Sequence, residues 1–537
     1  MHTRLLFCAA LACASAGSLE AQSGRYLSAQ FQPSVEAELR SYGANISVLP
    51  VVLGRSQTPQ LDTLEYRLVT PGNDDATNRP VVIIHHTGSY MPIALNGGLT
   101  GNINDGAVQE LAQRFAAFGY VVVTPEYRQG WNTIAPDVDE QTETLLIASL
   151  RGAQDMHMMT RYLRKTVEED GNPLGIDPSR IMAIGLGTGG YNVLNANFLD
   201  RVSEVNDLDK FIDSRDNLPY YDSTLYGNPY GTDRQTLNVP NWPAYESGFA
   251  FGVNVGGAMG DEAWIEGKAS EAPVAAMHSI VDRNAPFDLG NISVPTTRNV
   301  VLQDAPGSRR IVQVATEAGG NQLRVNAVHA ALVAQNNPIS LRIEQLESVP
   351  YTTTDGTETT LAFDNMYPFV YAEDARFANE YNYTDTSVLG PLIRPVIAAA
   401  QLPFTFEQLV QGELASNRNF LNPAGARTYL DTIMAFVLPR AYAVMNLDAL
   451  VGVEDLAVNV DLEVSPNPAN GAFAIEVRDD VVIERAEIFN ASGQLLHSAS
   501  FGGANRVRVE AEGLPAGIHV LFTHTSEGVA TSKLVIE

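Results

Sequence analysis

The chain has 537 residues, more than one hydrophobic core usually organises, so its length predicts two or three domains. Hydrophobic residues make up 45% of it and charged residues 18%, a balance typical of globular proteins rather than disordered ones. The formal net charge of −28 makes nucleic acids and anionic membranes poor partners, because both are polyanionic. No long apolar run follows residue 21, which argues against a transmembrane segment.

Residues 1–21 have the pattern of an export signal. Arg4 supplies a positive charge, residues 5–14 form a short apolar stretch, and small residues lead to a predicted cleavage site after Ala21. The alternatives are an earlier cleavage and a lipoprotein signal acylated at Cys13. Both cysteines, Cys8 and Cys13, lie inside this segment, so the mature chain is expected to have no disulfides and no thiolate sites.

Residues 76–445 alternate strand-like and helix-like stretches, which predicts a mostly parallel α/β sheet with helices on both faces. Residues 201–247 are rich in Asp, Asn, Tyr and Pro and predict an irregular insertion or lid. Residues 340–385 follow no clear period, so the last strand of the sheet is not placed. The expected elements, in chain order, are strands at 47–53, 63–69 and 81–84, a helix at 107–118, a strand at 119–123, a helix at 144–167, and strands at 180–184, 249–255 and 274–278.

A glycine-rich turn at residues 185–190 follows a predicted strand and opens a predicted helix, and two motifs compete for it. Gly185, Gly187 and Gly190 satisfy the G-x-G-x-x-G fingerprint of dinucleotide-binding proteins. That fingerprint expects an acidic residue after a further strand about 20 residues on, and a polar stretch stands there instead. Gly185 and Gly189 also fit the flanking glycines of the nucleophile elbow G-x-S-x-G, whose tight turn leaves no room for Cβ atoms.

The order of loop, strand, long helix, strand and elbow resembles secreted esterases of the α/β-hydrolase superfamily over about residues 76–290. The resemblance implies an α/β-hydrolase-like domain at 22–445. Residues 85–89 stand where such esterases carry a His-Gly-rich oxyanion loop. This implies pocket positions for the residues that follow the two strands: His86, Thr87, Gly88 and Leu186.

The same resemblance assigns an acid but no nucleophile. Residues 278–286 resemble the H-G-x-x-D-x-x-V-P segment of these esterases, whose acid corresponds to Asp282. The tip of the elbow is Gly187, which has no side chain to attack an ester. Thr188 is the adjacent hydroxyl, although its side chain is expected to point elsewhere. Between Asp282 and the C-terminal tail the only histidine is His329, in a segment with the pattern of a helix interior.

The sequence therefore predicts an α/β-hydrolase-like domain that has lost its triad. Its expected role is binding or structural, with a small ester, saccharide or lipid as the ligand. The alternative is an active esterase that uses Thr188 as a non-standard nucleophile. No cofactor and no metal site are predicted, because the sequence has no H-E-x-x-H motif, no cysteine cluster and no P-loop.

After an acidic, Val-rich linker at 446–461, residues 462–537 contain short strands at regular spacing, which predicts a small β-sandwich. On this pattern alone the tail could be any adhesive module. Its motifs are S-P-N-P-x-x-G at 465–471, I-F-N-x-S-G-Q at 488–494, G-L at 513–514 and K-L-V at 533–535. Together they resemble the type A C-terminal sorting domain of type IX secretion, found in Bacteroidota. The resemblance implies the type IX machinery as partner, passage through the periplasm, and delivery to the cell surface or the medium.

Overall fold

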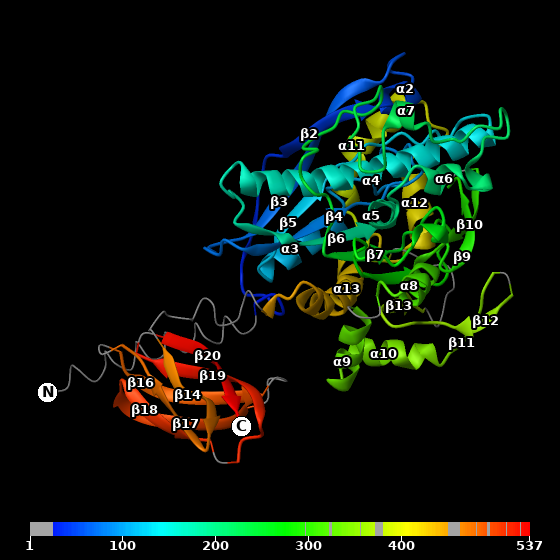
Figure 1. The fold of residues 1–537 in the computed structure, drawn as a ribbon. Coiled ribbons are helices and arrows are strands. Elements are labelled where there is room, and N and C mark those ends of the chain that lie inside the picture. Colours follow the sequence, from blue (N-terminus) through cyan, green and yellow to red (C-terminus); the bar gives the residue numbers. More distant parts are fainter. Residues whose placement is uncertain are drawn as a thin grey trace. The chain divides into compact units, whose positions relative to one another are not determined.

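The structure, a computed structural model, describes residues 25–537 except 296, 322–324, 355, 371–379, 449–461, 479–480, 491–494, 512 and 527. The predicted export signal with its cysteines and most of the predicted linker lie outside the described residues. The chain divides into two compact units, Met1–Met445 and Asn446–Glu537 (Figure 1). The finer division into signal, lid, linker and sorting domain stays a prediction.

The first unit is built on a nine-stranded sheet. Its strands are β1 (Pro33–Val35), β2 (Arg40–Ser47), β3 (Gln60–Pro71), β4 (Arg79–His85), β5 (Val121–Pro125), β6 (Ile176–Leu186), β7 (Phe251–Val255), β8 (Val274–Ser279) and β13 (Met366–Phe369). They follow the order β1-β3-β5-β4-β6-β7-β8-β13, and β2 also pairs with β3. From β5 to β13 all neighbours are parallel, whereas β3 is antiparallel to β5. The predicted mostly parallel α/β sheet is confirmed.

Helices cover both faces of this sheet, which is why its central strands are continuous apolar runs (Figure 1). On one face lie α4 (Val138–Glu168), α5 (Thr188–Phe198) and α8 (Ser308–Glu317), which share a core cluster. On the other lie α3 (Gly106–Ala117) and α13 (Pro423–Val444), which contact each other and the sheet. Met156 and Met159 of α4 are fully buried against the strands, as expected for the methionine-rich stripe of this helix.

The expected strand at 47–53 is wrong. β2 ends at Ser47, and α2 (Leu49–Val52) follows it as a single helical turn. The reason is Pro50, which has no N–H to give to a sheet but fits the first turn of a helix, where that N–H has no partner in any case.

Residues 201–247 contain only short helical turns, in keeping with the predicted irregular insertion: α6 (Ser203–Asn206), η1 (Asp209–Phe211) and α7 (Ser223–Tyr226). After η2 (Glu262–Trp264) and β8, the chain leaves the sheet for a long excursion and returns as β13, parallel to β8. The excursion contains β9 (Leu289–Ser293), β10 (Val300–Pro306), α8, α9 (Ala327–Ala334), α10 (Pro338–Glu347), β11 (Pro350–Thr352) and β12 (Glu358–Thr360). Helices α11 (Thr386–Ala399) and α12 (Phe406–Ser416) lie between β13 and α13. Among the described helices, none combines the length and hydrophobicity needed to span a bilayer.

The second unit is all β. Its strands are β14 (Glu463–Asn470), β15 (Ala472–Glu476), β16 (Ile483–Asn490), β17 (Leu495–Ala504), β18 (Arg506–Glu510), β19 (Gly517–Thr525) and β20 (Gly528–Ile536). They follow the order β17-β16-β19-β20-β14-β15-β18, and every pairing except β14 with β20 is antiparallel. Alternate residues such as Phe473, Ile475, Val507 and Val509 are buried in one core, as the period-two pattern of a sandwich requires.

Candidate functional site

The elbow between β6 and α5 is a single residue long. β6 ends at Leu186 and α5 begins at Thr188, so Gly187 alone makes the turn, with φ 51° and ψ −112°, a conformation that L side chains rarely adopt. A Cβ atom on Gly185 would lie 2.2 Å from the carbonyl oxygen of Gly189, and one on Gly189 would lie 2.2 Å from that of His85. The flanking glycines are therefore required by close backbone contacts.

The Thr87 hydroxyl occupies the space that a side chain at the elbow tip would need. A Cβ atom on Gly187 would lie only 2.4 Å from Thr87 Oγ1. The neighbouring hydroxyl, Thr188 Oγ1, accepts a hydrogen bond from the Ser89 N–H at 2.8 Å and is 9% exposed as a residue. Two hydroxyls thus surround the elbow, one in the place of a nucleophile and one bonded to the loop after β4.

Parallel strands end at the same edge of a sheet, and this brings Thr87, Gly187 and Asp282 together after β4, β6 and β8. All three line a narrow cavity of about 80 Å³, with Thr188 and Tyr191 beside them. The Asp282 carboxylate, only 2% exposed, accepts the N–H of Asn284 at 2.8 Å. Burial, followed by the Asp282 charge, raises the pKa of Tyr191.

A larger and more polar cavity, of about 360 Å³, adjoins the narrow one. The two cavities share a wall, to which Thr87, Ser89, Asn284 and Pro295 contribute. Gly88 lines the larger cavity only. Leu186 lines neither and is 1% exposed in the core beneath the elbow.

None of the histidines in the described part of the chain lines either cavity. The one near the acid is His278, whose Nε2 lies 3.5 Å from Asp282 Oδ2. Its ring is fully buried, and Nδ1 is 2.7 Å from Ser308 Oγ, which also accepts a hydrogen bond from the Asn254 amide. The sequence alone does not reveal this His–Asp–Ser contact, because Ser308 begins a helix that no motif marks. Since all its groups except the acid are sealed in the core, the contact positions Asp282.

His86, expected at the pocket, is buried and points away from it. Its Nδ1–H donates to the Thr87 carbonyl at 2.5 Å and its Nε2–H to Glu126 Oε2 at 3.1 Å. Burial opposes a charge on the ring, but Glu126 outweighs it and raises the pKa of His86. Burial also raises the pKa of Asp105 to about 7, against the opposing effect of His86. These groups hold the loop that carries Thr87.

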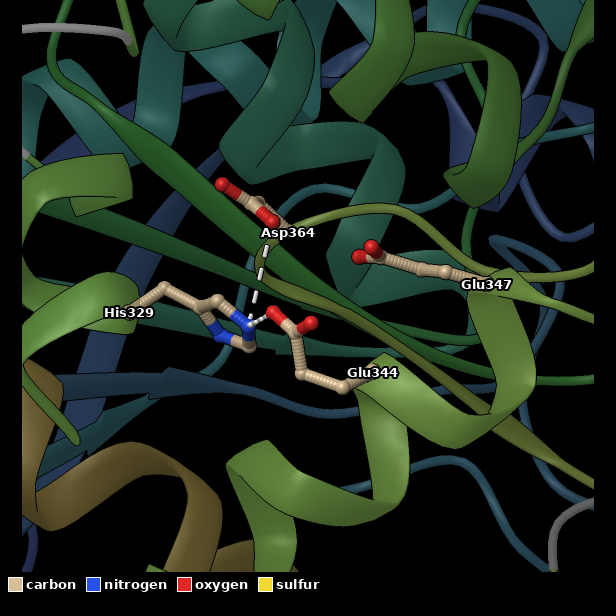
Figure 2. Close-up of side chains that lie close together, drawn as sticks. All are labelled: His329, Glu344, Glu347 and Asp364. Atoms are coloured by element: carbon tan, nitrogen blue, oxygen red, sulfur yellow. Dashed lines mark hydrogen bonds and ion pairs between the residues drawn. The ribbon is translucent and has the colours of Figure 1, made fainter. Parts of the chain in front are cut away.

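His329 lies in a different cluster. Figure 2 shows its ring on α9 facing Glu344 and Glu347 of α10 and Asp364, which precedes β13. Ligand-type atoms of the four residues lie within 4.8 Å of one another. His329 Nε2 is 3.3 Å from Glu344 and 3.7 Å from Asp364. Neither elbow cavity includes His329, so the structure does not join it to Asp282 there.

The donor set of this cluster does not fit a metal centre. Arg440 donates to His329 Nδ1 at 2.9 Å, and burial and then Arg440 lower the pKa of His329, so the neutral ring carries its proton on Nε2. A metal would need the Nε2 lone pair, and that nitrogen instead presents a proton to Glu344. Burial, followed by the Asp364 and Glu344 carboxylates, raises the pKa of Glu347 to about 8, so this carboxyl keeps its proton at neutral pH.

Comparison with known proteins separates the two units. Residues 463–537 match the family described as the secretion system C-terminal sorting domain. The tail is a type IX sorting domain. The chain is therefore exported, by secretion or to the cell surface. The first unit has an α/β fold, with a mostly parallel sheet and a glycine elbow after β6.

Solved structures similar to this chain include a thermophilic esterase of the Planctomycetes species Thermogutta terrifontis, esterase 2. Its native form shares 13% sequence identity, with a TM-score of 0.31, over 72% of this chain and 95% of that one. Its butyrate-bound form gives 14% identity and a TM-score of 0.32 over 72% and 96%. The form phosphoramylated by tabun gives 14% and 0.29 over 53% and 80%. No curated protein matches the sequence.

Proposed function

We propose that the α/β-hydrolase-like unit has lost ester hydrolysis and holds a small ligand in the cavities at its elbow. The observation that carries this proposal is the absence of an imidazole from the lining that the described residues give these cavities. Acyl transfer by a hydroxyl needs a base within hydrogen-bond reach to take its proton. The elbow tip offers no hydroxyl either, since it is Gly187.

The rival function is an esterase that attacks with Thr188. Two features weigh against it. A lone pair of Thr188 Oγ1 is already bonded to the Ser89 N–H, which fixes the hydroxyl against the loop. The acid at the site, Asp282, has its carboxylate turned toward His278 and the backbone N–H of Asn284, at distances of 3.5 and 2.8 Å. The acid is thereby engaged by groups other than Thr188.

Ester turnover distinguishes the two functions. The purified chain is expected to hydrolyse p-nitrophenyl butyrate no faster than buffer, and Thr188→Ala and Thr87→Ala are expected to leave that rate unchanged. The Thr87 variant is the matched control, because it removes the other hydroxyl at the elbow. Turnover that Thr188→Ala abolishes and Thr87→Ala preserves would contradict the proposal.

We also propose that residues 462–537 engage the type IX machinery directly. The α/β unit attached to them then crosses the periplasm and reaches the cell surface or the medium, where it binds its ligand. The match of residues 463–537 to the sorting-domain family supports this route.

A further inference from the structure

The larger cavity has a polar lining that the elbow does not explain. It is bounded by the loop after β4, the segment after β8, the β9–β10 turn and the C-terminal end of α12. Its volume of about 360 Å³ lies in the range of small-molecule sites. The narrow cavity, with Trp131, Leu145 and Ile292 in its wall, is more apolar. The site therefore has a polar chamber with an apolar recess.

Two arginines give the polar chamber positive charge. Arg283 and Arg298 both line it and both are exposed. Within the described part of the chain, neither guanidinium forms an ion pair or a side-chain hydrogen bond. Guanidinium groups match planar oxyanions through paired hydrogen bonds.

One acid also lines the chamber, and it is already engaged. Glu413 Oε1 accepts the N–H of Leu99 at 2.6 Å, and burial raises the pKa of this carboxyl. The other nearby acid, Asp282, lies in the narrow recess. An anionic group is therefore favoured in the chamber and disfavoured in the recess. A ligand with one anionic end would bind with that end in the chamber.

A buried amide in the chamber wall points to a ligand independently of the charges. Asn382 is 5% exposed and lines the chamber, yet its side-chain amide has no hydrogen-bond partner among the described residues. An amide offers both donors and acceptors, so a hydroxyl-rich ligand satisfies it.

We propose that the polar chamber binds an acidic saccharide, with its carboxylate on Arg283 and Arg298 and a hydroxyl on Asn382. This inference rests on the proposed function, because it names the ligand that the non-hydrolytic site holds. The carboxylate end lies in the chamber, and the less polar end points toward Gly187 in the recess.

Calorimetric titration of the purified chain with galacturonate, which carries one carboxylate, tests the proposal. The neutral match is the methyl ester of the same sugar, which keeps the hydroxyls and removes the charge. Galacturonate is expected to bind about tenfold more tightly than its ester, and 0.5 M NaCl is expected to reduce that difference. Equal affinities for the two probes, including no binding of either, would overturn the inference while leaving the lack of hydrolysis intact.

Variants test the contributions of the two arginines and of Asn382 to binding separately. Arg283→Gln and Arg298→Gln are each expected to lower the affinity for the acid about fivefold and leave that for the ester unchanged. Arg234→Gln, the same change at an exposed arginine that lines neither cavity, is the control and is expected to change neither affinity. Asn382→Ala is expected to lower the affinities for both probes by the same factor. Its melting temperature is recorded to verify that it folds.

The methyl ester also reports on the proposed function. Release of methanol from it, measured in the same samples, would overturn the non-hydrolytic function, whatever the order of the affinities. Tighter binding of the acid without methanol release supports both proposals. A lower affinity for the acid that Arg234→Gln reproduces would mean that overall charge causes it, and would overturn the assignment to the two chamber arginines.

Discussion

The elbow of the first unit and the strands of the second unit depend on their residues in different ways. At the elbow, the backbone shape is kept by Gly185 and Gly189, while the chemistry of such a turn depends on one side chain that Gly187 lacks. In the tail, recognition rests on several turns and strands spread over 463–537. A fold or an address that rests on many residues is therefore less sensitive to a single substitution than chemistry that rests on one side chain.

The largest effect is expected from removing the tail. Deleting residues 463–537 should abolish appearance of the chain outside the cell and leave it in the periplasm, because the sorting domain is the part that the machinery selects. Immunoblots of cell fractions measure this. The matched control fuses residues 463–537 to a periplasmic reporter, which should then be exported. Export of the truncated chain would show that the address lies in the first unit.

A methyl group at the elbow flank should destabilise the first unit strongly. Gly189→Ala would place its Cβ 2.2 Å from the His85 carbonyl oxygen, where neither helix α5 nor strand β4 can move at low cost, and is expected to lower the free energy of unfolding by about 2–3 kcal/mol. Gly248→Ala is the control, because a Cβ there meets nothing within 4 Å. Urea denaturation measures both. Equal free energies of unfolding for Gly189→Ala and Gly248→Ala would mean that the backbone at the elbow can move to accommodate a Cβ atom.

Restoring a serine at the elbow tip should cost stability and return no activity. Gly187→Ser places a side chain at φ 51° against Thr87 Oγ1 and is expected to lower the free energy of unfolding by about 2 kcal/mol. Adding Thr87→Ala should recover part of this loss by removing the contact. Neither variant should hydrolyse p-nitrophenyl acetate, because no imidazole of the described residues lines the elbow cavities. Hydrolysis by the double variant would reveal a base at the site.

A smaller effect concerns pH. The pKa of Asp105 is about 7 in the fold against 3.8 as its ordinary value, so its protonated form stabilises the folded chain. This contribution is complete below about pH 4 and is lost as the pH rises through about 7. Asp105→Asn, which keeps the oxygen that accepts the Gly101 N–H, should show a weaker fall in stability over this interval. Asp75→Asn, at an exposed carboxyl, should behave like the parent chain. If the free energy of unfolding of Asp105→Asn falls with pH as steeply as that of the parent chain, this carboxyl is not the origin of the pH dependence.

The sequence predicted those features that local chemistry determines. Apolar runs such as 81–84 identified buried strands, the spacing of Gly185 and Gly189 identified the elbow, and turn motifs identified the sorting domain. It could not place β13, because this strand is short and reaches the sheet only after the excursion that follows β8. The neighbours of His329 and the chamber around Arg283 were also beyond it, since both depend on contacts between segments far apart in the chain.

The direction of the His86 ring could not be predicted from the sequence, for a physical reason. The residue follows a strand end that faces the pocket, but its ring turns inward to Glu126, on the segment after the neighbouring strand β5. No local pattern reveals which of two adjacent residues turns toward a cavity. Thr87, the next residue, takes that position and fills the space beside Gly187.

The most direct test of the central claim is intact-mass measurement of the purified chain after incubation with a fluorophosphonate, which labels any activated hydroxyl. An unchanged mass is expected, because Gly187 has no side chain and no imidazole of the described residues lines either elbow cavity. A mass increase of one adduct, mapped by peptide sequencing to Thr87, Thr188 or Ser89, would contradict it and show that the site still activates a nucleophile.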